Sequence, residues 1–163
     1  MKTLFKRLIF KHKFKSCTVK LESHNKNIVN DKNIIKMMED FQYNTLLEST
    51  NLIKTIQATK SITHLITVDN GTQSKVVGFL RITKSVESQT PEFAKESNMN
   101  CLDWLYIKPE CRKLGIGSRV LEKLFNNYKP FYLIPNTLES EQYFKRTELF
   151  AMNGKFMITK NNF

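Results

Sequence analysis

Apolar and polar residues alternate, or recur with the period of a helix, along most of this chain, and these two patterns predict a series of strands and helices. The first strand is expected over residues 17–22, where alternation coincides with β-branched residues. A helix is expected after Asp31, which can cap its first turn, and a second helix up to about Lys60. The apolar stripes that predict these helices are Ile34, Ile35, Met38 and Phe41, followed by Leu46, Leu47, Ile53 and Ile56.

Turn-forming residues divide the middle and the end of the chain. Asp69-Asn70-Gly71-Thr72 and Asn153-Gly154 tolerate positive φ, so each of them predicts a β-hairpin. The strands expected around these turns are residues 64–68 with 75–82, and residues 149–152 with 155–159. The polar stretch 84–100, which contains Pro91, is expected to form the longest loop.

The remaining elements follow residue 100. An apolar strand over residues 102–107 precedes an amphipathic helix with the stripe Ile116, Val120, Leu121, Leu124 and Phe125. A short strand over residues 131–134 stops at Pro135, and a helix follows from Leu138 to about Arg146. The predicted order is β, α, α, β, β, β, α, β, α, β, β, which indicates an α/β fold with a mixed sheet and helices on its faces.

The domain organisation is simple. The sequence has no internal repeat and no linker, so residues 1–163 are expected to form one domain. The basic segment 1–15 has an undecided structure, because its start has helical spacing and its continuation alternates as in a strand. The residues on the helical face are Leu4, Phe5, Leu8 and Ile9, and the alternating ones are Lys11, Lys13 and Lys15.

The composition favours an ordered cytoplasmic protein. Hydrophobic residues make up 40% of the chain, but no apolar run approaches the ~18 residues of a transmembrane helix. The N-terminus lacks the apolar region and cleavage site of a secretory signal. Cys17, Cys101 and Cys111 form no C-x-x-C pair, which favours a reducing compartment and argues against structural zinc.

The net charge of +11 is concentrated at the start of the chain. The basic residues that precede the first acid, Glu22, are Lys2, Lys6, Arg7, Lys11, Lys13, Lys15 and Lys20. Such a segment favours an anionic partner such as nucleic acid, an acidic protein or a membrane surface. The alternative is a chain that is generally rich in Lys, Asn and Ile and binds no polymer.

The turn between strand 102–107 and the following helix carries the strongest chemical signal. Its residues, Arg112-Lys113-Leu114-Gly115-Ile116-Gly117, combine basic side chains with two glycines at a helix start. Glycines allow an anion to approach the backbone, and the unpaired N–H groups of a helix N-terminus point towards it. The turn therefore indicates a diphosphate site, with a merely tight connection as the alternative.

Four motifs together resemble the GCN5-related N-acetyltransferase (GNAT) superfamily. Val76-Val77-Gly78-Phe79 is similar to its third-strand run, and Ile107 to Arg112 matches V-x-P-x-x-[QR]. Arg112 to Gly117 matches the acetyl-CoA signature [QR]-x-x-G-x-[GA], and Asn136 with Tyr143 is similar to N-x-x-A-x-x-x-Y. The chain departs from the family at Glu139, where a small residue is usual, and in lacking the Gly-Phe that closes this helix.

The resemblance implies a twisted mixed sheet with about four helices, splayed fourth and fifth strands, and acetyl-CoA as acyl donor without a metal. It places the pantetheine arm on Leu105, Tyr106 and Ile107. It also assigns to cofactor binding the residues Arg112, Lys113, Leu114, Gly115, Ile116, Gly117, Ser118 and Asn136.

The catalytic position of Tyr143 comes from the resemblance, and the other candidates come from their sequence surroundings. Tyr143 is expected to protonate the leaving thiolate, with an ordinary core aromatic as the alternative, unless a one-residue shift puts Phe144 in its place. Asp103 stands inside an apolar strand and is the candidate base, with hydrogen-bonded structure or a water-mediated reaction as alternatives. His64 is expected to be structural, Cys111 is not expected to be a nucleophile, and Met37, Met38 and Phe41 are expected to serve the core or the acceptor pocket.

The predicted function is transfer of the acetyl group of acetyl-CoA to a primary amine of a small-molecule or macromolecular acceptor that the sequence does not identify. One alternative is a GNAT-like module that binds acyl-CoA or nucleic acid without turnover. Another is a tRNA- or translation-directed acetyltransferase that uses the basic N-terminal segment. The resemblance is also compatible with a homodimer.

Overall fold

The computed structural model describes Phe10 and residues 17–24, 32–45, 61–84, 90–127 and 130–160, and it confirms the mixed α/β fold. The strands are β1 Thr18–His24, β2 Ser61–Asp69, β3 Ser74–Thr83, β4 Asn100–Ile107, β5 Phe131–Leu133, β6 Phe150–Asn153 and β7 Phe156–Thr159. The helices are α2 Lys32–Thr45, α4 Glu92–Glu96, α5 Ile116–Asn127 and α6 Leu138–Arg146, with a 3₁₀ turn, η2, at Pro109–Cys111.

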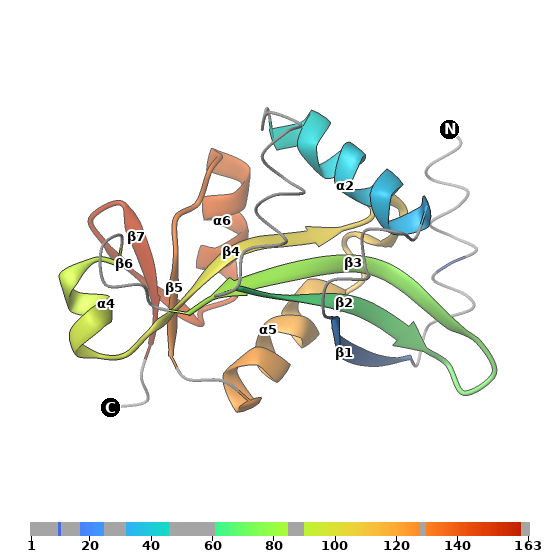
Figure 1. The fold of residues 1–163 in the computed structure, drawn as a ribbon, viewed down its shortest axis with the longest axis horizontal. Helices are drawn as coiled ribbons and strands as arrows, with labels where there is room; N and C mark the ends of the chain where they lie inside the picture. The colour runs from blue at the N-terminus through green and yellow to red at the C-terminus, as the bar shows by residue number, and fades with distance from the viewer. Residues whose placement is uncertain are drawn as a thin grey trace.

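The described strands form one sheet in the order β1-β2-β3-β4-β5-β7-β6. Neighbouring strands are antiparallel except for β4 and β5, which are parallel. Helices α2 and α5 lie on opposite faces of the sheet (Figure 1). None of the described helices is long and apolar enough to cross a membrane.

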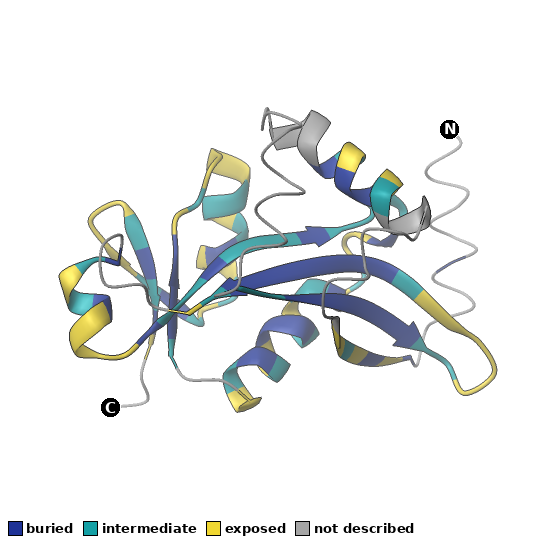
Figure 2. Ribbon diagram, viewed as in Figure 1, coloured by how far each residue is buried: buried dark blue, intermediate teal, exposed yellow. Residues whose placement is uncertain are grey.

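Two buried clusters follow from this layering. The predicted stripe of α5 packs onto the sheet, with Val120, Leu121 and Leu124 completely buried. On the other face, a smaller cluster joins α2 to the sheet through Met37, Met38, Phe41, Leu65, Phe79 and Tyr106. The buried segments run along the central strands and the inner side of α5 (Figure 2). Helix α5 and strand β1 therefore bury the faces that their sequence periods predict, whereas the central strands β2 and β3 are buried on both faces.

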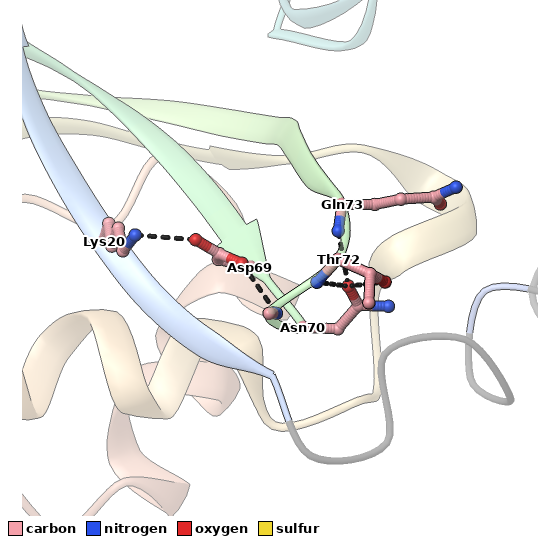
Figure 3. A network of polar contacts seen from close by, with 6 residues as sticks. Lys20, Asp69, Asn70, Thr72 and Gln73 are labelled. Atoms are coloured by element: carbon pink, nitrogen blue, oxygen red, sulfur yellow. Dashed lines mark hydrogen bonds and ion pairs between the residues drawn. The ribbon is translucent and has the colours of Figure 1, made fainter.

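The hairpin between β2 and β3 shows why its sequence favours a turn (Figure 3). Asp69 Oδ1 accepts the Gly71 N–H at 2.8 Å, and Asn70 Oδ1 accepts the Thr72 N–H at 3.1 Å. Gly71 adopts a φ of 88°, which glycine tolerates without steric cost. Lys20 Nζ on β1 also donates to Asp69 Oδ2 at 2.6 Å. Short Asx side chains thus satisfy the backbone where the strands reverse.

Strands β4 and β5 separate soon after they meet. Their ladder consists of the pairs Asn100 with Phe131 and Cys101 with Tyr132. Strand β4 continues to Ile107, whereas β5 ends at Leu133 and turns away from it (Figure 1). Pro135 follows and has no N–H to extend a ladder. Within the described residues, one backbone edge of β4 at this fork between β4 and β5 therefore has no ladder partner beyond Cys101, as the splayed strands of the predicted fold require.

A β-bulge in β4 sets the side-chain directions along this edge. Arg81 pairs with Trp104 and Ile82 pairs with Leu102, so Asp103 is the extra residue. Leu102 packs in the α5 cluster, but two residues later Trp104 packs against the α2 cluster. The bulge thereby reverses which positions of β4 face each side of the sheet.

A second irregularity lies in β3, next to the end of β4. Ile66 pairs with Gly78 and Thr67 pairs with Val76, which leaves Val77 as the extra residue. A Cβ on Gly78 would stand 2.0 Å from the carbonyl oxygen of Tyr106. Glycine is therefore required here by the close approach of the β4 backbone.

The prediction of a long loop over residues 84–100 is wrong in part, because α4 occupies Glu92–Glu96 within it. Pro91 precedes this helix with a φ of −55°, which prepares its first turn. Ala94 and Met99 are buried with Tyr132, so tertiary packing stabilises a helix too short to show a periodic pattern. The predicted helix over 46–60 and the N-terminal segment 1–15, apart from the buried Phe10, lie outside the described residues.

Candidate cofactor-binding and active site

The loop between β4 and α5 presents backbone donors at one end of the fork. Lys113 and Gly115 have φ values of 60° and 73°, and the first helical bond runs from the Arg119 N–H to the Gly115 carbonyl at 3.2 Å. Among the described residues, none accepts a hydrogen bond from the backbone N–H groups of residues 113–118. Arg112 differs, because its N–H donates to the Pro109 carbonyl at 3.3 Å. These free donors at a helix N-terminus suit an anion.

The Tyr143 side chain reaches this same helix start from α6. Its hydroxyl lies 2.3 Å from the position that a Cβ on Gly117 would occupy. The hydroxyl oxygen is buried and makes no hydrogen bond of good geometry within the described chain. Burial raises the pKa of Tyr143 to about 12, and the nearby Ser118 hydroxyl opposes that rise. The site thus contains a neutral phenol that is close to Ser118 but forms no hydrogen bond of good geometry within the described residues.

The register of α6 explains why Tyr143 rather than its neighbour faces the loop. Thr137 begins the helix with a capping box, in which it and Ser140 each accept the other's backbone N–H at 3.1 Å. Phe144 then points into the core, with its ring 5.4 Å from that of Phe150. Asn136 is exposed immediately before the cap.

Asp103 projects from the bulge into a polar network on the α2 side of the sheet. The Thr83 hydroxyl donates to Asp103 Oδ2, and Arg81 Nε lies 3.8 Å from the same oxygen. Arg81 is buried, its Nη2 donates to Ser61 Oγ at 2.9 Å, and its guanidinium stacks on Trp104 at 4.7 Å. The Asp103 side chain stays 23% exposed, so it is both held in place and accessible.

The network extends to the point where β4 and β5 part. Cys101 hydrogen-bonds to Asp103 and to Tyr132, and burial raises the pKa of its thiol. Burial also raises the pKa of Tyr132 to about 12, and Thr90 is a further partner of its hydroxyl. The sequence analysis did not identify Arg81, Thr83 and Tyr132 as site residues. The one sequence signal for them was Arg81, a cation inside the apolar run of β3.

The other singled-out residues lie apart from this chemistry. His64 is buried within β2, with its Nδ1 3.2 Å from Ser23 Oγ. Cys111 is fully buried, and desolvation raises its pKa to about 12, which is unsuited to a nucleophile. No group of side chains that could hold a metal ion occurs within the described ranges.

Comparison with known proteins agrees with this geometry. The model of the acetyltransferase (GNAT) family matches residues 33–134. The chain therefore belongs to the GNAT acetyltransferase family. A comparison with curated protein sequences finds no match.

Solved structures share the fold at low sequence identity. The chain is similar to a KacTA–DNA complex (TM-score 0.57, 12% identity, 86% of this chain and 92% of that chain covered). It is equally similar to AtaTR bound with AcCoA (TM-score 0.57, 11% identity, 86% and 92% covered). A domain from Methanocaldococcus jannaschii DSM 2661 gives a TM-score of 0.55 at 12% identity, with 88% and 97% covered.

Proposed function

We propose that the protein is an acetyl-CoA-dependent N-acetyltransferase that transfers the acetyl group directly to a primary amine. The observation that carries the proposal is the joint placement of an open fork beside β4, a loop of unpartnered amides and the buried Tyr143 hydroxyl. A donor such as acetyl-CoA needs free amides for its diphosphate, an open strand edge for its extended arm and a proton donor near its thioester. The AcCoA-bound AtaTR structure has a related fold and supports this donor.

The residues present fit such a donor. The amides of residues 113–118 would hold the diphosphate, and the free edge of β4 at Leu105, Tyr106 and Ile107 would bind the pantetheine amides. Asn136, which is exposed just before α6, would contact the same arm. The acyl donor supplies an activated carbonyl. The protein aligns that carbonyl and excludes water from it.

Tyr143 is proposed as the general acid. Transfer forms a C–N bond, breaks the C–S bond and leaves a thiolate that needs a proton. A phenol with a pKa raised to about 12 keeps its proton throughout the neutral range. Phe144 cannot take this role, because it lacks a hydroxyl and packs in the core.

Asp103 is proposed as the group that accepts the proton of the incoming amine. The bulge turns it towards the α2 side of the sheet, and Thr83 and Arg81 fix its carboxylate there. Its remaining exposure lets a cationic amine approach and lose a proton before attack.

Binding of the donor is the first test. Acetyl-CoA at ~100 times its Kd should raise the free energy of unfolding by about 2.7 kcal/mol, because only the native state binds it. Free adenine at the same concentration is the control and should give no shift. No stabilisation at millimolar acetyl-CoA would contradict the proposal. Stabilisation without acetylation of any amine, including polyamines and lysine peptides, would instead define an acyl-CoA-binding module.

Asp103→Asn tests the base. The variant keeps an acceptor for the Thr83 hydroxyl but cannot take a proton, so kcat/KM at neutral pH should fall by about 10²-fold. The deficit should shrink as the pH rises, because more of the acceptor amine is then already neutral. Glu96→Gln on the exposed side of α4 is the matched control. An unchanged kcat/KM for Asp103→Asn would leave Asp103 a structural residue.

A further inference from the structure

The Tyr106 side chain on β4 contacts both α2 and Arg112, the first residue of the cofactor loop. We infer that Asp40, Tyr106 and Arg112 form a strut that orders α2 together with the cofactor loop, so that donor binding organises the α2 side of the site. The effect of this strut on catalysis rests on the proposed function. The structural basis of the strut is independent of that function.

The contacts of Arg112 form the loop end of the strut. Its Nε donates to the Ile107 carbonyl at 2.8 Å, and its guanidinium lies 5.6 Å from the centre of the Tyr106 ring. Both contacts direct the side chain back onto the end of β4, and its own N–H is taken by Pro109. Arg112 therefore fixes where the free amides of the loop begin, in addition to any charge it offers the donor.

The contacts of Tyr106 form the other end. Its hydroxyl donates to Asp40 Oδ2 on α2, 66 positions away in the sequence. The residue is 4% exposed, and burial together with Asp40 raises the pKa of its phenol. Its ring also lies 5.8 Å from Phe41 and 5.4 Å from Phe79. One side chain thus holds a helix by a hydrogen bond and the loop arginine by its ring.

Coupling between two sites is reciprocal. If the strut holds the loop in its donor-binding form, then removing the contact with α2 must make the loop conformation less ordered. Conversely, a donor that stiffens the loop must stiffen α2. Helix α2 also carries Met37, Met38 and Phe41, which cover the sheet beside Trp104, so its position shapes the side from which Asp103 is reached. Tyr106, Asp40 and Arg112 are positioning residues in this scheme.

Hydrogen exchange of the free protein tests the strut without any ligand. The loop amides to follow are those with a backbone acceptor, namely Cys111, Arg112 and Arg119. Asp40→Ala should speed their exchange by about tenfold, the equivalent of one hydrogen bond to a charged group. Tyr106→Phe should have a similar effect because it removes the same bond and keeps the ring. Asp40→Asn retains an acceptor and should restore most of the protection. Glu39→Ala, an exposed neighbour on α2, is the matched control.

A second measurement adds coenzyme A. Its Kd should rise about fivefold in Asp40→Ala and remain unchanged in Glu39→Ala. Loop exchange at the wild-type rate in both Asp40→Ala and Tyr106→Phe would overturn the strut, whether or not coenzyme A binds. If the wild-type protein does not bind coenzyme A, the proposed function fails, and loop exchange alone still decides the strut. If Asp40→Ala does not fold, Tyr106→Phe provides the test.

Discussion

Replacing Tyr143 by Phe is expected to lower kcat by about 10²–10⁴-fold, with little change in the KM for acetyl-CoA. The Tyr143 hydroxyl is buried at the start of α5 and makes no hydrogen bond of good geometry in the described chain. Burial raises its pKa to about 12, so it carries its proton at neutral pH. The variant removes this proton donor and leaves the ring against Gly117. Steady-state kinetics with a reactive primary amine, combined with acetyl-CoA binding, measure both effects.

Two controls separate acid catalysis from packing. Gln142→Ala on the exposed side of α6 should behave as wild type. Gly117→Ala keeps the phenol but places a Cβ 2.3 Å from its hydroxyl, so the hydroxyl must move and kcat should fall as well. In a Tyr143→Phe background the same methyl group meets only the ring, 3.2 Å away, and should cause much less further loss. Full activity in Tyr143→Phe would remove the residue from the mechanism.

Gly78→Ala is expected to destabilise the fold by more than about 3 kcal/mol, beyond the usual cost of overpacking. The added methyl group would stand 2.0 Å from the Tyr106 carbonyl oxygen, and a backbone atom in a ladder cannot move aside as a flexible side chain can. Strands β3 and β4 would have to separate where Gly78 pairs with Ile107. Urea unfolding followed by circular dichroism gives the free energy.

Gly71→Ala is the matched control for that measurement. It also replaces a glycine in the β2–β3 unit, but a Cβ there meets nothing within 4 Å. Its φ of 88° should cost about 1–2 kcal/mol through backbone strain alone. A Gly78→Ala variant no less stable than Gly71→Ala would contradict the close approach of β3 and β4.

Local sequence signals were sufficient where one segment determines its own structure. The Asx residues of the Asp69–Thr72 turn bind their own backbone, and the Asn153-Gly154 turn is followed by β7 as expected. The stripe of α5 also predicted its buried face. Strand starts were less well defined, because β2 begins at Ser61 and β4 at Asn100, ahead of their apolar runs.

The details of the site depend on contacts between distant segments. A one-residue shift in α6 exchanges Tyr143 for Phe144, and the capping box at Thr137 fixes that register in the structure. The bulge at Asp103 follows from the pairing of β4 with β3, which the sequence of β4 alone does not reveal. The bond between Tyr106 and Asp40 joins a strand to a helix far along the chain, so no local pattern predicts it.

The short ladder at the fork has a consequence for cooperativity. Within the sheet, the antiparallel unit β1–β4 meets the unit β5–β7 through only the Asn100–Phe131 and Cys101–Tyr132 pairs of the described ladder. A sheet opens first at a short ladder of this kind, because few backbone hydrogen bonds must break there. An acyl donor lying along the fork would contact both units next to this short ladder. Binding of the donor would then also hold the two halves of the sheet together at the backbone, where in the empty protein only the side chains of the shared core, such as Phe131 and Leu133, do so beyond this ladder.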